Sequence, residues 1–298
     1  MGVEPRLTLP PEVRARLRAL RLLPRTARGQ RGIGQHASRS RGAGLEFAQY
    51  RAYEPGDELR QIDWKLYARS DRFFVREAER ESPVTVWILL DATASAAQAD
   101  RAVPARSRLD HMCQLAACVV ELAVQQNDPF GLLAIHGEGL QRVPAGQGAR
   151  QRDRVHLQLQ ALQAQGCWPA TERLRPLWER VQPGDLVLAI GDGFDEAGTV
   201  LLEQLAATRR DVVLLQVLTA EERDFPFTAG HRFRDPETGE ELLGDGAALR
   251  ADYLQRFGAA QQALHARLRA AGVASATGWL DQAVDAPLQA LYGRGRGP

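Results

Sequence analysis

Three side chains able to bind a metal ion follow an apolar stretch of the sequence. Asp91, Thr93 and Ser95 stand at alternate positions directly after the run 84–90. Mg²⁺ takes small oxygen ligands and keeps several waters, so one carboxylate and two hydroxyls suit it, with Mn²⁺ as a substitute ion. The structural alternative is that Asp91 and Ser95 cap the helix that follows.

The apolar run 84–90 is expected to be a central strand of a parallel sheet. Seven apolar or β-branched residues in succession are typical of a strand that is covered on both faces. Ligands of such sheets bind beyond the carboxyl ends of the strands. A further strand is expected at 186–190, and Asp192 follows it closely. This pattern places a second aspartate at the end of a core strand.

Strands and helices alternate along the remainder of the chain. Strands are expected at 130–135, 186–190, 212–218 and 273–280, and helices at 107–126, 151–165, 172–181, 198–208 and 247–271. This order predicts an α/β fold with a doubly wound, mostly parallel sheet of the Rossmann type and an edge hairpin at 137–143. Two more strands are expected in a small β-rich N-terminal subdomain, at 45–53 and at 73–81, the second entering the main sheet. The predicted divisions are 1–43, 44–82, 83–222 and 223–298.

The first 43 residues form a basic arm, with ten arginines and two glutamates. Residues 10–23 predict a short amphipathic helix, because Val13, Leu17 and Leu20 recur at helical spacing among the arginines. We expect this helix to pack on its own domain, and the alternative is weak contact with a membrane surface or nucleic acid. The arm lacks aromatic residues interleaved with its arginines, so nucleic acid is not an expected partner. Residues 25–43 predict a linker.

Arginines and aspartates alternate beside aromatic residues just upstream of the apolar run. Opposite charges of this kind often hold a small subdomain together through paired hydrogen bonds, which is the interpretation we favour. The alternative is a surface that binds an anion or a partner's acidic face. The residues concerned are Arg51, Tyr53, Gly56, Asp57, Arg60, Asp63, Trp64 and Arg69.

Several classes of enzyme are excluded by missing motifs. The single lysine, Lys65, stands in no Walker A loop, and the chain has no Gly-x-Ser-x-Gly elbow. A metal-dependent phosphohydrolase with Asp91 as nucleophile stays open as an alternative, although Thr93 stands where a second aspartate is usual. The three cysteines are odd in number and lack metal-ligand spacing, so we expect reduced thiols. The chain has no span of about 20 apolar residues, so we expect a cytoplasmic protein. Because the motifs of these enzyme classes are missing, we also expect no catalytic residues.

The spacing Asp91-x-Thr93-x-Ser95 resembles the metal-ion-dependent adhesion site of von Willebrand factor type A domains. The upstream motifs resemble the bacterial family called domain of unknown function 58, as does Asp235-Pro236-x-Thr238-Gly239-Glu240 before a long helix. Those upstream motifs are Glu46-Phe47, Arg51-x-Tyr53, Pro55-Gly56-Asp57, Arg60, Ile62-Asp63-Trp64 and Ala68-Arg69. The resemblance covers the chain from about residue 44 to its end.

This resemblance implies a site and a partner. In type A domains an aspartate at the position of Asp192 completes the metal site, and a partner's carboxylate fills the open coordination position. A threonine that the pattern also requires is missing from 144–153. Members of the family are typically encoded beside AAA+ ATPases of the MoxR type. The resemblance therefore implies a non-enzymatic adaptor for such an ATPase and an unknown client protein.

Overall fold

The computed structural model describes residues 7–23, 47–53, 62–78 and 84–293. The chain forms two units, each described by itself below. The larger comprises Met1–Gln30 and Val84–Pro298, and the smaller Arg31–Pro83. Of the helices in the described residues, none combines the length and apolar character that crossing a bilayer requires.

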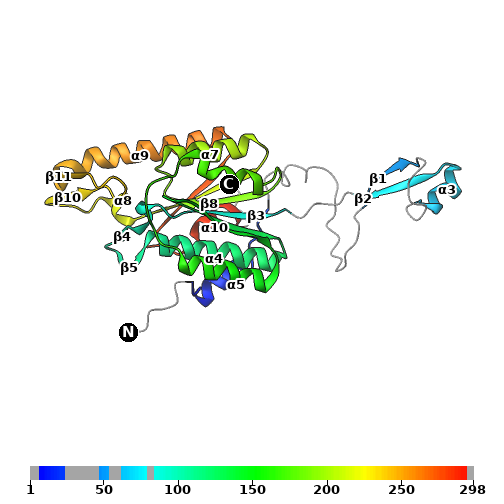
Figure 1. Ribbon diagram of the computed structural model, residues 1–298, viewed down its shortest axis with the longest axis horizontal. Coiled ribbons are helices and arrows are strands. Elements are labelled where there is room, and N and C mark those ends of the chain that lie inside the picture. The colour runs from blue at the N-terminus through cyan, green and yellow to red at the C-terminus, as the bar shows by residue number, and fades with distance from the viewer. Residues whose placement is uncertain (1–6, 24–46, 54–61, 79–83, 294–298) are drawn as a thin grey trace. The chain divides into compact units, whose positions relative to one another are not determined.

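A six-stranded sheet forms the centre of the larger unit (Figure 1). Five strands run parallel, and β7 joins the edge antiparallel to β6, as predicted for the edge hairpin. The spatial order is β12 (Ala274–Trp279), β9 (Asp211–Leu218), β8 (Leu186–Gly191), β3 (Val86–Asp91), β6 (Phe130–His136), β7 (Gly139–Gly146). The predicted α/β class with a mostly parallel sheet is confirmed, and β3 lies inside the sheet.

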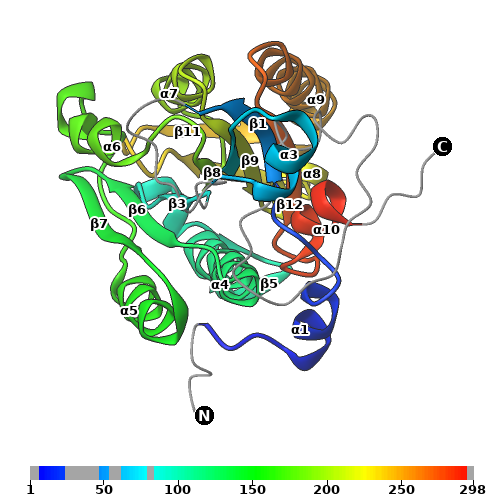
Figure 2. The ribbon, with the colours of Figure 1, turned by 90° about the vertical axis from the view of Figure 1, so that its right-hand side faces the viewer.

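Helices cover both faces of this sheet, as Figure 2 shows. One face carries α1 (Pro11–Leu17), α4 (Arg108–Gln126), α5 (Gly148–Ala161) and α10 (Ala286–Tyr292), and the other α6 (Arg175–Arg180), α7 (Glu196–Ala207) and α9 (Gly246–Ala270). A hydrophobic core lies on each face of the sheet, and alternate residues of β3 pack into the two cores. Ile88 and Leu90 face α4, whereas Trp87 and Leu89 face the opposite helix layer. This double burial explains why the strand is apolar without alternation.

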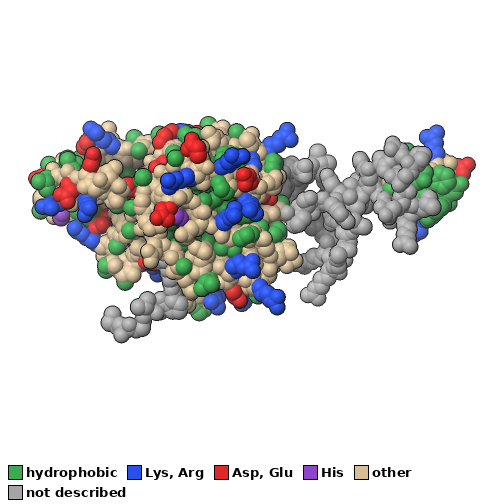
Figure 3. All heavy atoms as spheres, viewed as in Figure 1, with side chains coloured by type: hydrophobic (Ala, Val, Ile, Leu, Met, Phe, Trp, Pro, Cys, Tyr) green, Lys and Arg blue, Asp and Glu red, His purple; other side chains and the backbone are tan. Residues whose placement is uncertain are grey.

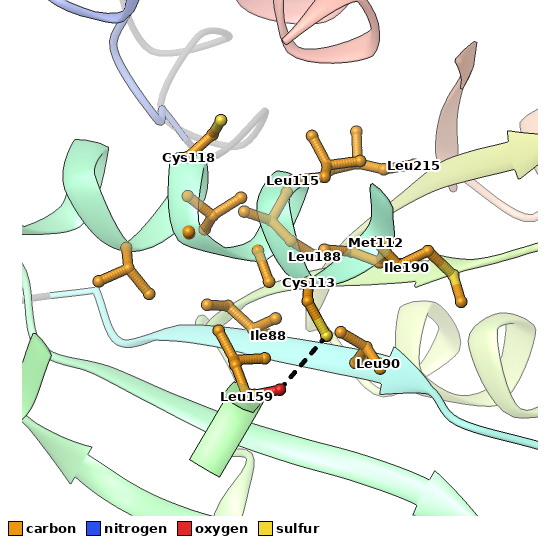
Figure 4. Close-up of a cluster of buried hydrophobic side chains, with 14 of the residues drawn as sticks. Ile88, Leu90, Met112, Cys113, Leu115, Cys118, Leu159, Leu188, Ile190 and Leu215 are labelled. Carbon is orange, nitrogen blue, oxygen red and sulfur yellow. Dashed lines mark hydrogen bonds between the residues drawn. The ribbon is translucent and has the colours of Figure 1, made fainter. Parts of the chain in front are cut away.

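The core between β3 and α4 is built from aliphatic and sulfur-containing side chains (Figure 4). Met112 and Cys113 lie against Ile88 and Leu90, and the Cys113 thiol donates to the Leu159 carbonyl oxygen over 3.6 Å. Cys113 and Cys118 are buried and Cys167 is exposed, and all three are free thiols. Two of the three cysteines therefore lie in the core.

The N-terminal helix α1 packs on the larger unit, as expected. Val13 and Leu17 are buried in the same core as α4. The Arg16 guanidinium donates two hydrogen bonds, of 2.7 and 2.5 Å, to the Asp285 carboxylate, which is fully buried. The apolar stripe of α1 is therefore buried in the core of the larger unit. The predicted linker 25–43 lies outside the described residues.

Figure 3 shows acidic and basic side chains interspersed on one face of the larger unit.

The smaller unit contains β1 (Phe47–Ala52), α3 (Trp64–Ser70) and β2 (Phe74–Ala78). The prediction that the strand at 73–81 enters the main sheet is wrong, because β2 pairs antiparallel with β1 in a sheet of its own. An apolar strand pattern identifies a strand without identifying its neighbour, and the nearby β1 supplies the pairing edge.

The arginine and aspartate motif falls partly within this smaller unit. Asp63 caps α3, since its carboxylate accepts from the backbone N–H groups of Lys65 and Leu66. Tyr53 and Trp64 both contact the Phe73 ring edge to face. Arg51 lies on β1 and Arg69 in the last turn of α3. Gly56, Asp57 and Arg60 lie outside the described residues.

His111, on α4, is fully buried, and its two ring nitrogens have no hydrogen-bond partner among the described residues. Burial, reinforced by Arg106, lowers the pKa of His111 to about 4. The neutral ring is therefore kept in the folded protein while the unfolded chain takes up a proton below about pH 6.5.

We expect this histidine to cost stability in acid. As the pH falls from about 6.5 towards 4, the free energy of unfolding should drop by at most about 1.4 kcal/mol per pH unit through His111. His111→Leu should remove that part of the slope, which urea unfolding at several pH values measures. An identical pH dependence in the variant would contradict the assignment.

Candidate functional site

The end of β3 brings together the three side chains predicted to bind a metal ion. Asp91 is the last residue of the strand, and its Oδ1 accepts from the Thr93 backbone N–H over 2.9 Å. The Thr93 and Ser95 hydroxyl oxygens lie 3.1 Å apart. The strand continues into the short 3-10 helix η2 (Ala94–Ala97), which has no side-chain cap. The capping alternative for these residues is therefore not what the structure shows.

Asp192 lies one residue beyond β8, at the same edge of the sheet. Gly191, the last residue of β8, lies directly beside Asp91, and a Cβ atom in its place would be 3.0 Å from the Asp91 Cβ. The glycine therefore allows the ends of β3 and β8 to lie close together. Asp192 is almost fully buried and both carboxylate oxygens are engaged. Oδ2 accepts from the Arg108 guanidinium over 2.6 Å, and Oδ1 accepts from the Phe194 backbone N–H over 3.1 Å. Asp192 is thus near Asp91, as predicted, but already paired.

Arg108 is the first residue of α4 and is 1% exposed. Its Nη2 donates to the Glu222 carboxylate over 2.5 Å and to the Gln98 side-chain oxygen over 3.1 Å. Glu222 belongs to α8 (Ala220–Asp224) and forms the capping box of that helix with Thr219. One buried guanidinium therefore joins α4, α8 and the loops after β3 and β8. Any cation that bound Asp192 would compete with this ion pair.

Burial and the neighbouring Asp192 both disfavour the charged form of the Asp91 carboxyl group. Burial, followed by the nearby charge of Asp192, raises the pKa of Asp91 to about 7. The Thr93 hydrogen bonds lower it, and Glu237 raises it slightly. Removing a carboxylate from water and placing it beside another both favour its protonated form, whereas a bound cation favours the charged form. A cation would therefore have to displace a proton from Asp91 below about pH 7.

Glu237 is a further carboxylate that the topology brings to this edge. It lies in the turn between β10 (Gly230–Arg234) and β11 (Glu241–Asp245), where it is half-buried while its neighbours in the turn are exposed. Burial raises the pKa of Glu237, and the charges of Asp195, Asp192 and Asp235 raise it further. The sequence marked this turn as a motif but gave no reason to expect a half-buried carboxylate in it.

The donors present fit a small divalent cation in part. Asp91, Thr93 and Ser95 supply a carboxylate and two hydroxyls at one turn, which is the donor set that Mg²⁺ accepts together with waters. Within the described ranges, no three His, Cys, Asp or Glu side chains come close enough to hold an ion together. An ion here would therefore depend on the hydroxyls and on retained waters.

The stretch 144–153, from which a threonine was expected, forms the end of β7 and the first turns of α5. Residues 165–166 cross the end of β3 instead: the Gln165 N–H donates to the Ala92 carbonyl oxygen over 2.9 Å, and the Gly166 carbonyl oxygen accepts from the Ala94 N–H over 2.7 Å. Gly166 has φ +68°, and a Cβ there would lie 2.6 Å from the Gly137 Cα, so a side chain is excluded. The next hydroxyl along the chain, on Thr171, begins the 3-10 helix η3 (Thr171–Leu174).

Other polar residues around the site left weak signals in the sequence. Gln216 is the polar residue within the apolar strand β9, and its side chain donates to the Asp192 carbonyl oxygen over 2.8 Å. Arg108 is a charged residue at the start of the mostly buried helix α4. Both were detectable as polar groups in apolar surroundings, but their partners were not.

Known proteins resemble this chain in sequence and in fold. The family described as "Protein of unknown function DUF58" matches residues 49–263. The uncharacterized proteins Rv1480 of Mycobacterium tuberculosis (strain ATCC 25618 / H37Rv) and Mb1516 of Mycobacterium bovis (strain ATCC BAA-935 / AF2122/97) are each 26% identical over 265 residues, which is 86% of this chain and 81% of the relative.

Two solved structures are similar at lower identity. The conserved hypothetical protein BatB from Bacteroides thetaiotaomicron has 17% identity and a TM-score of 0.37, over 63% of this chain and 98% of that chain. The SpRpn10 VWA domain has 12% identity and a TM-score of 0.39, over 72% of this chain and 99% of that chain.

Proposed function

Because this chain belongs to the DUF58 family, whose function is unknown, we propose its role from the geometry of the candidate site. It is a non-enzymatic interaction protein of the von Willebrand factor A-like type, and it recognises a partner through Mg²⁺ held by Asp91, Thr93 and Ser95. The observation that carries this proposal is the convergence of those three oxygen donors at the end of β3.

The protein's own residues would prepare this site for a partner. Asp91 holds the turn by accepting from the Thr93 N–H, which fixes both hydroxyls at one edge. Arg108 neutralises Asp192 and so limits the negative charge next to Asp91. A bound Mg²⁺ would supply a positive centre with an open position for a partner's carboxylate. Recognition would then require both the ion and an acidic side chain.

The proposed partner is an AAA+ ATPase of the MoxR type, for which this chain serves as adaptor towards a client protein. Support for this part comes from the family resemblance of the motifs at Arg51, Asp63 and Trp64, and from the absence of catalytic motifs in the sequence. In this arrangement the ATPase provides the energy for remodelling or maturation, and this protein provides recognition.

The alternatives find less support in the geometry. In a metal-dependent phosphohydrolase that used Asp91, the adjacent Arg108 would not be free to bind the phosphoryl group, because it is already paired with Asp192 and Glu222. An adaptor acting on membranes through the basic arm would need the apolar stripe of α1, which is buried in the core.

Thermal unfolding with and without Mg²⁺ or Mn²⁺ tests the metal site. Since an ion that binds the folded state stabilises it, the wild-type midpoint should rise with ion concentration. Thr93→Val, which keeps the shape of a buried residue but removes its hydroxyl, should reduce this rise. The exposed Thr208→Val serves as the matched control, because Thr208 ends α7 at a helix terminus. An unchanged wild-type midpoint at millimolar ion concentration would remove the support for the ion bridge.

A further inference from the structure

A groove of about 590 Å³ lies between α1, α4 and α5 in the larger unit. Figure 2 places α1 and α5 on either side of α4, on one face of the sheet. Cavities that hold small molecules in proteins have volumes of about 300–1,000 Å³. None of the residues that line this groove belongs to the candidate site at Asp91. It is therefore a separate place where a small molecule fits.

The helices that form the groove are packed and held in place. The ion pair of Arg16 with Asp285 ties α1 to the start of α10. After α1, the Leu22 backbone N–H donates to the Gln126 side-chain oxygen over 2.7 Å, and the Gln126 amide donates back to the Leu22 carbonyl oxygen over 3.0 Å. Buried residues of α5 belong to the same core as α1. The groove is thus formed before any ligand binds.

Two guanidinium groups of α1 line the groove without a partner. Arg14 and Arg18 are four residues apart, so they lie on the same side of the helix. Neither side chain makes an ion pair or a hydrogen bond with any of the residues that the structure describes. Arg152, on α5, also lines the groove, but it donates to Asp153 over 3.0 Å. The uncompensated positive charge therefore comes from the α1 side.

The opposite side of the groove carries groups that bind hydroxyls. Glu121 of α4 is half-buried there, and the amides of Gln125 and Gln160 lie on α4 and α5. His156 of α5 has a buried Nε2 without a hydrogen-bond partner in the described ranges. Burial lowers the pKa of His156, so its ring is neutral near pH 7. Carboxylate, amide and neutral imidazole groups all form hydrogen bonds with hydroxyl groups.

We propose that this groove binds a phosphorylated sugar, with its phosphate on Arg14 and Arg18 and its hydroxyl groups on the side of Glu121. Guanidinium groups match the oxygen atoms of a phosphate through paired N–H donors. No Phe, Tyr or Trp among the described residues lines the groove, so it offers no ring on which a nucleobase could stack. The bound sugar phosphate joins α1 to α4 and α5. This site goes beyond the proposed function and does not depend on a metal ion.

Calorimetry of the full chain with glucose-6-phosphate and ribose-5-phosphate tests the proposal. The wild type should bind these sugar phosphates, and Arg14→Gln and Arg18→Gln should each weaken binding by about tenfold or more, because hydrogen bonds to a charged group are lost. Both arginines are exposed, so these variants should fold as the wild type does. Arg154→Gln is the matched control and should leave binding unchanged, because Arg154 is exposed on α5 and does not line the groove.

Further ligands separate sugar recognition from simple attraction of an anion. Inorganic phosphate should bind about tenfold or more weakly than glucose-6-phosphate, because it lacks the hydroxyl groups. Vesicles of phosphatidylglycerol and phosphatidylcholine present a phosphate and hydroxyls on a lipid, and they should not compete with glucose-6-phosphate. Equal binding of inorganic phosphate, binding to the vesicles alone, no binding of either sugar phosphate, or an equal loss in Arg154→Gln would each overturn the proposal. The response of the midpoint to Mg²⁺ is a separate measurement, so the two proposals fail independently.

Discussion

Asp91→Asn is expected to stabilise the ion-free protein at about pH 8 and to abolish its response to Mg²⁺. The raised pKa, about 7 in the folded protein against 3.8 ordinarily, means that folding disfavours the charged carboxylate. The protonated Asp91 carboxyl group stabilises the folded protein fully below about pH 4, and this stabilisation is lost as the pH rises through 7. Asparagine keeps the Oδ1 that accepts from the Thr93 N–H and removes the charge, so the gain has an upper limit of about 4 kcal/mol.

Urea unfolding in the presence of a chelator measures this gain. The protein provides its own control, because at about pH 4 the folded protein keeps Asp91 protonated and the advantage of asparagine should shrink. A gain of equal size at both pH values would show that the charge is not the cause. A stabilised variant that no longer responds to Mg²⁺ would identify Asp91 as a residue kept for binding at the expense of stability.

Arg108→Met is expected to destabilise the protein by about 3–5 kcal/mol. Methionine fills much of the space but leaves Asp192 and Glu222 without their counter-charge in a buried setting. Denaturant unfolding measures the loss. Arg267→Met is the matched control, because Arg267 pairs with Glu196 and Glu203 on the surface, where solvent screens ion pairs and its loss should leave the stability nearly unchanged.

A second substitution separates charge from packing. Arg108→Met combined with Asp192→Asn should recover part of the stability that Arg108→Met loses, because one of the stranded charges is removed as well. If the losses of the two single variants simply add, the buried ion pair is not the source of the effect, and the loss reflects packing at the start of α4.

The elements that the sequence predicted correctly are those with long buried patterns. β3, β6, β8 and β9 are mostly apolar and buried along their length, and α4 repeats buried residues at helical spacing. The hairpins β4–β5 (Ala99–Asp100 and Val103–Ser107) and β10–β11 were not predicted, because their short polar strands lack such a pattern. The pairing of β2 with β1 was missed because strand partners are decided by tertiary contacts.

The residues of the candidate site also differ in whether the sequence could predict them. Asp91, Thr93 and Ser95 were found because they are close in sequence, so the strand that carries them also brings them together. The location of Asp192 followed from the parallel order of strands, but its pairing with Arg108 did not. Arg108 reaches the site through contacts between residues distant in the sequence, which no local pattern contains.

The packing of α1 has a consequence for how the chain is assembled. Because α1 and β3 belong to one unit and residues 31–83 between them to another, the smaller unit is an insertion whose two ends return to the same host. The entropy of closing a loop grows only slowly with its length, so the length of this insert should have a small effect on the stability of the unit that carries Asp91.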